Sequence, residues 1–489
     1  MPDSLKQKTI SGMMWTSFGK FGSMIIAFIA NLILARLLSP DDFGCVGMLA
    51  IFIAISQTFI EGGFGSALIQ KKNPEHIEYT TIFYWNLLVS FFFVVGIYFL
   101  APSIASFYKI PLLENVLRIQ SLILLINAFS VIPANILIKQ LKFKVLNIRN
   151  IVAAFCGMIV AVIMAWNGFG VWSLVYNNLV TSTVSVLLLW TMTSWRPTME
   201  FSWGAIKRLF RFGGLILCSN LVETLYTNIQ GLIIGRVFSA KDLGYYAQAK
   251  KLEEVPNTGF SSVVNSVTFP IYSVLQDDKT KMRFGVHKSL VSITYLNIPL
   301  MVILILVAKP LFTLLFSIKW LPSVPYFQIL CVFGMLWCVN TINTNLVKAL
   351  GKGNIYFFIQ VLKRVIGVIL IFWSVQYGMY EMLWAYTFTG WVCFFINAYF
   401  AGKLIQYGVM AQIKAVGPVL LLSLGIGIIT YAIFKYLIVN NSFLMVLVPV
   451  CVYISLYIFF SYLFKIEGFV VFKEILFDKF IRYFRNKND

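Results

Sequence analysis

Five basic side chains interrupt long apolar stretches of the sequence, and their chemistry suits them to bind an anion. A charge at the centre of a bilayer costs about 3 kcal/mol on insertion scales, so it usually faces a cavity or an ionic partner. Arginine can hold a phosphate through two parallel hydrogen bonds, whereas lysine acts as a point charge. The alternative is that the lysines extend to a membrane interface. The candidate anion-binding residues are Lys20, Lys250, Lys251, Lys363 and Arg364.

Glutamates in the same kind of stretch are candidates for coupling to a gradient of H⁺ or Na⁺. A buried carboxylate can exchange a proton or bind sodium, although it can also be a hydrogen-bonded structural group. Lys250 and Glu254 are four residues apart and can pair along one helix face, and Pro256 is expected to kink that helix. The candidate coupling residues are Glu61, Glu223, Glu253 and Glu254.

The sequence predicts neither a metal centre nor an enzyme. The two histidines, His76 and His287, are far apart, and the cysteines form no CxxC pair. No P-loop, nucleophile elbow or candidate catalytic triad is present. We therefore expect no cofactor beyond a possible coupling ion.

The elements that carry these charges are apolar blocks long enough to cross a membrane. Hydrophobic residues make up 59% of the 489-residue chain and charged residues 12%, against roughly 25% charged in soluble domains. In lipid, a helix satisfies its own backbone hydrogen bonds. The sequence therefore predicts an all-α polytopic membrane protein with about 14 spans. The expected spans are 11–37, 43–69, 80–106, 115–138, 147–166, 170–193, 211–238, 244–273, 289–316, 324–348, 355–375, 382–402, 415–437 and 443–464.

The net charge of +20 follows the expected topology. Its basic residues are spread over many short loops, which is unlike the clustered charge of a nucleic-acid surface. If the N-terminus is cytoplasmic, most of them lie in cytoplasmic loops and tails, as the positive-inside rule requires. We therefore expect both termini to be cytoplasmic and expect no nucleic-acid partner.

Two turn sequences repeat at an offset of 200 residues, at 36–44 and 236–244. Serine and aspartate can cap the next helix, and glycine permits tight geometry, so the expected role of the motif is structural. The matching positions are Arg36, Ser39, Asp42 and Gly44 in the first copy and Arg236, Ser239, Asp242 and Gly244 in the second.

The repeat predicts two copies of a six-helix unit. An even number of spans makes the copies parallel, as in several transporter folds whose halves move against each other. The expected domains are an N-terminal bundle at 1–210, a second bundle at 211–402, and two C-terminal helices with a basic cytoplasmic tail at 403–489.

The turn sequence also carries a family resemblance. The stretch 34–44, Leu-Ala-Arg-Leu-Leu-Ser-Pro-Asp-Asp-Phe-Gly, resembles the Wzx-type polysaccharide flippases, closest to the WzxC and TuaB branch. Stretches 64–71, 212–214 and 233–236 continue the likeness. The wider superfamily includes the multidrug and toxin extrusion (MATE) antiporters and the lipid II flippase. The resemblance implies a MATE-like fold of two six-helix bundles around a central cavity, in a bacterial inner membrane.

The resemblance further implies a substrate. It would be an undecaprenyl-pyrophosphate-linked oligosaccharide, moved to the outer leaflet by alternating access for lipopolysaccharide or exopolysaccharide synthesis. The basic candidates would then bind the pyrophosphate. Membrane lipid, a polysaccharide polymerase and export machinery are the implied partners. One departure concerns span 7, where the family often carries a central acidic residue. Asn228 and Gln230 occupy that stretch, and Glu223 lies about one turn earlier.

An ion-coupled multidrug antiporter of the same fold is the alternative. Its largely cationic substrates would favour an acidic cavity, whereas basic candidates slightly outnumber acidic ones within the spans. A polysaccharide polymerase or ligase is a further alternative. Such enzymes are expected to act through a sizeable outer loop, and the outer loops here are short.

Overall fold

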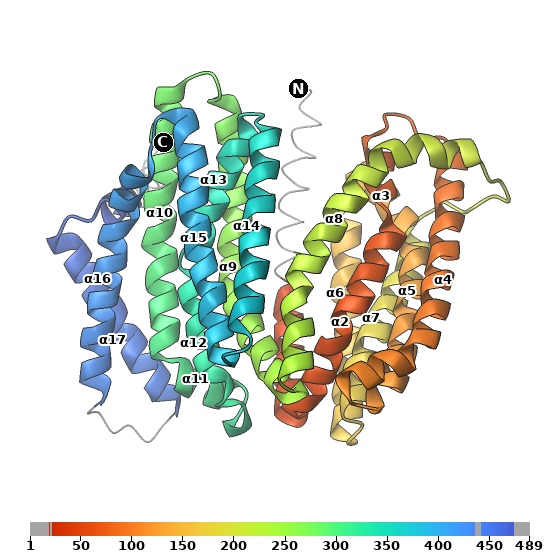
Figure 1. Cartoon of the computed structure of the whole chain (residues 1–489), viewed down its shortest axis with the longest axis horizontal. Helices are drawn as coiled ribbons and strands as arrows, with labels where there is room; N and C mark the ends of the chain where they lie inside the picture. Colours follow the sequence, from red (N-terminus) through yellow and green to blue (C-terminus); the bar gives the residue numbers. More distant parts are fainter. Residues whose placement is uncertain (1–18, 20–21, 436–441, 474–489) are drawn as a thin grey trace, which may run out of the picture. The chain divides into compact units, whose positions relative to one another are not determined.

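The described residues of this computed structural model are almost wholly helical (Figure 1). They comprise residue 19, residues 22–435 and residues 442–473, without the side chains of 211 and 212. No β-strand occurs among them, and 11 of their helices are long and apolar enough to cross a membrane. The predicted all-α polytopic fold is therefore confirmed. The other three predicted spans correspond to a shorter apolar helix, Gly22–Leu37, and to two more polar helices, α8 and α9.

Contacts between residues divide the chain into two compact units, Met1–Gly244 and Tyr245–Asp489. This grouping places α8 and the first turn of α9 with the N-terminal helices. The predicted domain boundaries after residues 210 and 402 were placed by the sequence repeat, not by contacts between residues. They stay a prediction.

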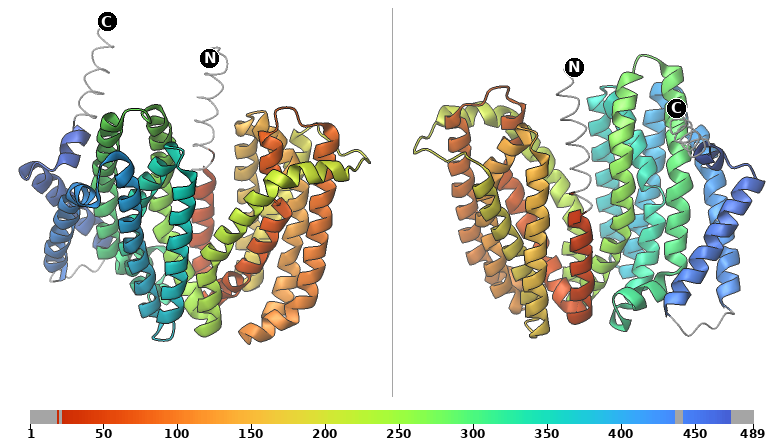
Figure 2. Two further views of the ribbon diagram at one scale, coloured as in Figure 1. Left: turned by 45° about the horizontal axis from the view of Figure 1, so that its top comes forward. Right: turned by 180° about the vertical axis from the view of Figure 1, so that it is seen from behind.

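The first unit is a bundle in which α4 packs on α5, α6 on α7, and α2 on the long α8 (Figure 2). Glycines allow close approach of α2 and α8, because a Cβ at Gly231 would lie 3.8 Å from the carbonyl oxygen of Gly47. Gly62 and Gly63 adopt positive φ angles and separate α2 from α3. The helices are α2 Pro40–Glu61, α3 Phe64–Gln70, α4 His76–Tyr108, α5 Leu112–Lys139, α6 Phe143–Trp166, α7 Val171–Met192 and α8 Trp203–Val237.

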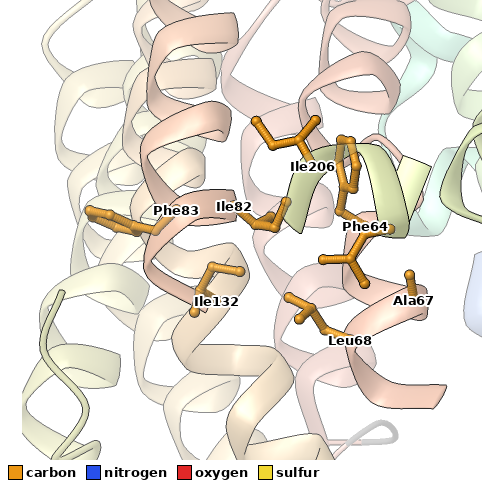
Figure 3. Packing of buried hydrophobic residues seen from close by; sticks show 8 residues of the cluster. Phe64, Ala67, Leu68, Ile82, Phe83, Ile132 and Ile206 are labelled. Carbon is orange, nitrogen blue, oxygen red and sulfur yellow. The ribbon is translucent and has the colours of Figure 1, made fainter. Parts of the chain in front are cut away.

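A cluster of buried apolar side chains joins α3, α4, α5 and α8 within this unit. Figure 3 shows Ile82, Ile132 and Leu68 gathered between the helices, while the ring of Phe83 points away from them. Phe83 lies edge-on to Trp190 and Trp195, with ring centroids 5.9 and 5.6 Å apart. Because lipid is itself apolar, this interlocking of side chains, rather than escape from water, holds the helices together. The cluster comprises Phe64, Ala67, Leu68, Ile82, Phe83, Ile132, Ile206 and Leu209.

The second unit is built around α10, which contacts α12, α13, α15, α16 and α17. The last two helices pack against each other and against α10 (Figure 1). The helices of this unit, with α9 entering from the first, are α9 Ala240–Val274, α10 Lys279–Leu306, α11 Ala308–Leu315, the short 3₁₀ helix η1 Ile318–Trp320, α12 Ser323–Gly334, α13 Trp337–Ala349, α14 Gly353–Ser374, α15 Met379–Ile405, α16 Val409–Lys435 and α17 Ser442–Leu463.

The predicted span 324–348 is interrupted between α12 and α13. α12 ends at Gly334 and α13 begins at Trp337. The carbonyls of Gly334 and Met335 accept hydrogen bonds of 3.0 and 3.2 Å from the amide nitrogen of Asn297 on α10. Non-helical backbone at membrane depth is tolerated where protein groups satisfy it, and Asn297 supplies that partner here.

Candidate functional site

The two repeated turns adopt the same local structure. Ser39 caps α2, and its hydroxyl donates to Asp42 Oδ2 at 2.6 Å while accepting from the Asp42 amide at 3.3 Å. Ser239 and Asp242 make the same two contacts at 2.6 and 3.0 Å at the start of α9. In each copy the serine hydroxyl therefore caps a helix N-terminus, and in the first copy the Ser39 amide also donates to Asp42 Oδ2 at 2.9 Å, which completes a capping box.

The glycines of the two turns pack against each other's copy. A Cβ at Gly44 would overlap the carbonyl oxygen of Ala240, and a Cβ at Gly244 would overlap the carbonyl oxygen of Pro40. Each glycine therefore approaches the first residue of the other copy's helix. Arg236 lies nearby over the ring of Phe107, 4.8 Å from its centroid.

The two candidate glutamates of the first unit lie at its surface. Glu61 is the last residue of α2 and accepts a 3.0 Å hydrogen bond from Gln57 Nε2. The side-chain oxygen of Gln57 in turn accepts from Asn127 at 3.4 Å. Glu223 on α8 is exposed. Neither carboxylate lies in the packed interior of the unit.

In the second unit, α9 presents an ion pair and a separate buried carboxylate. The predicted pairing of Lys250 with Glu254 is confirmed by a 3.9 Å contact between Nζ and Oε1. Lys250 also lies 5.8 Å from the centroid of the Tyr246 ring. Glu253 is only 4% exposed and accepts a hydrogen bond from Asn257. The helix continues through Pro256 without interruption.

Lys363 on α14 ends a chain of side-chain amides. Its ammonium donates to Asn397 on α15 at 3.4 Å, and Asn397 donates to Asn340 on α13 at 2.6 Å. Asn340 donates onward to the carbonyl of Gly390 at 3.4 Å. Arg364 is half-buried and projects from another side of α14, because successive helical residues are about 100° apart. The amides hold Lys363 toward the interior of the unit.

Two basic candidates remain, Lys251 and Lys20. Lys251 on α9 is exposed, and Lys20 lies outside the described residues. The structure places Lys250 and Lys251 on α9 and Lys363 and Arg364 on α14, all four in the second unit.

Sequence reasoning missed the buried amides that surround the interruption between α12 and α13. Asn297 and Asn257 are 0% and 3% exposed, and Asn397, which is 2% exposed, donates to Asn340 on α13. Uncharged polar residues within apolar spans were the available signal, because such groups need hydrogen-bond partners in lipid.

A buried carboxylate in the first unit was also missed. The side chain of Glu78 is 1% exposed and contacts Lys71 Nζ at 2.6 Å and Arg208 Nη2 at 3.6 Å. Lys139 donates to the backbone carbonyl of Lys71. These contacts join the loop before α4 to α5 and α8. They have the pattern of a structural ion network.

Two comparisons of sequence bear on the role of the chain. The model of a family described as "Polysaccharide biosynthesis protein" matches residues 33–325. Lipopolysaccharide biosynthesis protein WzxC of Escherichia coli (strain K12) is 27% identical over 74% of this chain and 74% of that protein. Teichuronic acid biosynthesis protein TuaB of Bacillus subtilis (strain 168) is 27% identical over 88% of this chain and 90% of that protein.

A solved structure has the same fold. The lipid II flippase MurJ, in an inward closed conformation, superposes with a TM-score of 0.76 over 92% of this chain and 98% of that one. The two sequences are 16% identical, so the likeness concerns the fold alone.

Proposed function

The chain belongs to the polysaccharide biosynthesis protein family, and we propose that within it the chain is a flippase for undecaprenyl-pyrophosphate-linked oligosaccharide. The match over residues 33–325 carries this proposal, because it covers most of the first unit and part of the second. The predicted resemblance to the Wzx-type flippases is confirmed by that match and by the relatives WzxC and TuaB. The family and both relatives are named for the biosynthesis of polysaccharides, and the 11 apolar helices make transport across a membrane the step that fits this chain.

Transport would move the lipid-linked sugar from the cytoplasmic to the outer leaflet of a bacterial inner membrane by alternating access of the two halves. A pyrophosphate head loses its hydration as it crosses, and cationic side chains can replace that hydration. Lys250, Lys363 and Arg364 of the second unit, together with Lys20 and Lys251, are the proposed contacts. A polysaccharide polymerase and export machinery would take up the product.

A drug antiporter of the same fold has less support. The curated relatives WzxC and TuaB are named for polysaccharide synthesis rather than drug transport. The buried carboxylate of α9 suits a coupling ion as well as it suits a cationic substrate.

Accumulation of lipid-linked oligosaccharide in cells that lack the gene tests the proposal. We expect intermediates to gather in the cytoplasmic leaflet and surface glycan to fall. Complementation with Lys20→Ala or Arg364→Ala should fail although both variants insert normally. Lys279→Ala, which removes an exposed charge at the start of α10, should restore export. Unchanged surface glycan and lipid-linked pools in a strain without a second flippase would overturn the proposal.

A further inference from the structure

Three cations of the first unit gather around a single buried carboxylate, Glu78. Lys71 Nζ and Arg208 Nη2 lie 2.6 and 3.6 Å from its Oε1. Lys139 joins the group by donating to the backbone carbonyls of Leu68 and Lys71. Within the described ranges, no carboxylate pairs with Lys139. The group of Lys71, Lys139, Arg208 and Glu78 therefore carries a net charge of +2.

The cations of this group are held in place and yet stay open to an external anion. The side chains of Lys71 and Arg208 are 37% and 63% exposed, although both contact the buried carboxylate. Glu78 is itself fixed, because its Oε2 accepts from the Glu75 amide at 3.0 Å. Lys207, next to Arg208, is exposed. A guanidinium has five N–H donors, so Arg208 can bind an anionic oxygen without releasing Glu78.

Exposed apolar side chains lie next to the same cations. Trp203 on α8 is 62% exposed, and the centroid of its ring lies 6.2 Å from that of Trp85 and 5.3 Å from that of Phe201. Trp203 and Lys207 are four residues apart, so they share one face of α8. Phe201 and Met199 are exposed as well. Rings and cations side by side are typical of a helix that lies at the level of lipid headgroups.

The first turns of α8 direct these side chains away from the bundle. They cross the end of the unit beside α3 and α4 (Figure 1). Ile206 and Leu209 belong to the buried cluster, whereas Lys207 and Phe210 are exposed. This amphipathic pattern places the cations and rings at the end of the unit rather than within it. The predicted topology makes that end cytoplasmic.

The chemistry of the surface identifies its partner. A phospholipid has an anionic phosphate directly above its acyl chains, so one molecule can meet the cations and the rings together. A free phosphate would use the cations but not the rings. The cytoplasmic leaflet carries anionic lipid and attracts basic segments. We propose that Lys71, Lys207, Arg208 and Trp203 form a docking surface for an acidic phospholipid of the cytoplasmic leaflet.

This surface goes beyond the proposed function, because it binds a lipid of the surrounding bilayer rather than the transported one. Binding can be measured without transport. A protein that binds the phospholipid here and exports no glycan would keep the surface and lose only the proposed function.

Titration of the purified full-length protein with phosphatidylglycerol, followed by native mass spectrometry, tests the surface. Phosphatidylcholine with the same acyl chains, which has no net charge, is the comparison. We expect phosphatidylglycerol to bind more tightly. The double variant Lys207→Gln/Arg208→Gln should weaken its binding about tenfold or more. This variant leaves Lys71 to pair with Glu78, so the buried carboxylate keeps a cation.

A matched control removes two charges elsewhere. Lys279→Gln/Lys281→Gln replaces two exposed lysines at the start of α10 and should leave phosphatidylglycerol binding unchanged. Equal weakening by the two double variants would show attraction by net charge alone and overturn the proposal. Equal binding of the two phospholipids by the unaltered protein would also overturn it. Normal phosphatidylglycerol binding by Lys207→Gln/Arg208→Gln would do so too, and loss of glycan export in that variant would then assign these cations to the transported lipid.

A second measurement locates the bound lipid. Brominated acyl chains quench the fluorescence of a tryptophan that they touch. We expect brominated phosphatidylglycerol to quench the protein more than brominated phosphatidylcholine, and we expect this difference to shrink in Trp203→Phe, which keeps an aromatic ring. Far-ultraviolet circular dichroism and size-exclusion chromatography verify that each variant is folded. An unchanged difference in folded Trp203→Phe would place the lipid elsewhere and overturn the proposal.

Discussion

Glu253 and Glu254 are neighbours in the sequence but lie in opposite environments. One is buried among amides, and the other is exposed and paired with Lys250. Adjacent helical residues point about 100° apart, so one turn of α9 can serve both environments. The sequence could not show which of the two glutamates is buried. The apolar residues of α9 form no clear stripe, so they do not define which face of the helix points inward.

The amide that holds Lys363 provides a prediction at the residue scale. Asn397→Ala removes the acceptor of Lys363 and leaves Asn340 without its donor. Since buried polar groups left without partners cost about 1–3 kcal/mol, we expect a lower melting temperature in thermal denaturation. Asn167→Ala, which removes an exposed amide bonded only to its own helix end, is the control and should melt like the unaltered protein. Equal melting temperatures for the two variants would contradict a stabilising role for the hydrogen bonds of Asn397.

At the scale of elements, the sequence could predict where helices occur but not where a helix is interrupted. Runs of about 20 apolar residues indicated the spans, because that length crosses the hydrocarbon core. The break at Met335 and Leu336 has no such signal, since both residues are apolar and no proline follows Gly334 at once. The break depends on Asn297, which is distant in sequence and supplies the lost hydrogen bonds.

The two turn glycines provide a prediction at the element scale. Gly44→Ala and Gly244→Ala each place a methyl group against a backbone carbonyl. The helix starts must then separate, so we expect each variant to lower the melting temperature by a similar amount. Gly96→Ala is the matched control, because a Cβ there meets nothing within 4 Å. Replacement of a mid-helix glycine by alanine should stabilise the helix by about 0.5–1 kcal/mol.

A second prediction concerns the segment that follows α17. His287 on α10 contacts the Tyr407 hydroxyl at 2.6 Å through Nδ1 and Glu467 at 2.7 Å through Nε2. Burial, together with the charge of Glu467, raises the pKa of Tyr407 to about 12. A raised folded-state pKa means that the stabilisation is complete below the unfolded value of about 10.

That stabilisation should be lost as the pH rises through the interval from about 10 to about 12. We expect the melting temperature to fall across this interval and the fall to be shallower in Tyr407→Phe, which has no ionisable group. Thermal denaturation at a series of pH values measures the difference. Parallel curves for the two proteins would show that Tyr407 does not contribute.

For the whole molecule, the fold and the family could be predicted from the sequence to a greater extent than the site. Composition and the repeated turn indicated an all-α transporter, and a TM-score of 0.76 to MurJ agrees with that fold. The intramembrane charges were visible as residue types, but their partners come from other helices. Lys363 meets Asn397 on α15, and Glu253 lies against Gly334 on α12, across long separations in the chain.

Membrane topology provides a prediction at this scale. Because the sequence predicts an even number of spans and its loops show a positive-inside bias, we expect both termini to be cytoplasmic. Fusions of green fluorescent protein after Asp489 should fluoresce, and fusions of alkaline phosphatase there should be inactive. Alkaline phosphatase inserted after Lys109, at the end of α4, should be active. The reverse pattern would invert the predicted orientation.

The crossed contact of the two turns has a consequence for how the two copies can vary. With an offset of 200 residues, Ala240 corresponds to Pro40 and Gly244 to Gly44. Gly44 lies against Ala240, and its counterpart Gly244 lies against Pro40, the counterpart of Ala240. The same exchange of contacts occurs in a two-fold symmetric dimer, where residue i of each chain contacts residue j of the other. In a dimer of identical chains, one substitution alters both contacts at once. In this single chain Gly44 and Gly244 are separate residues, so a substitution can alter one contact and leave the other intact.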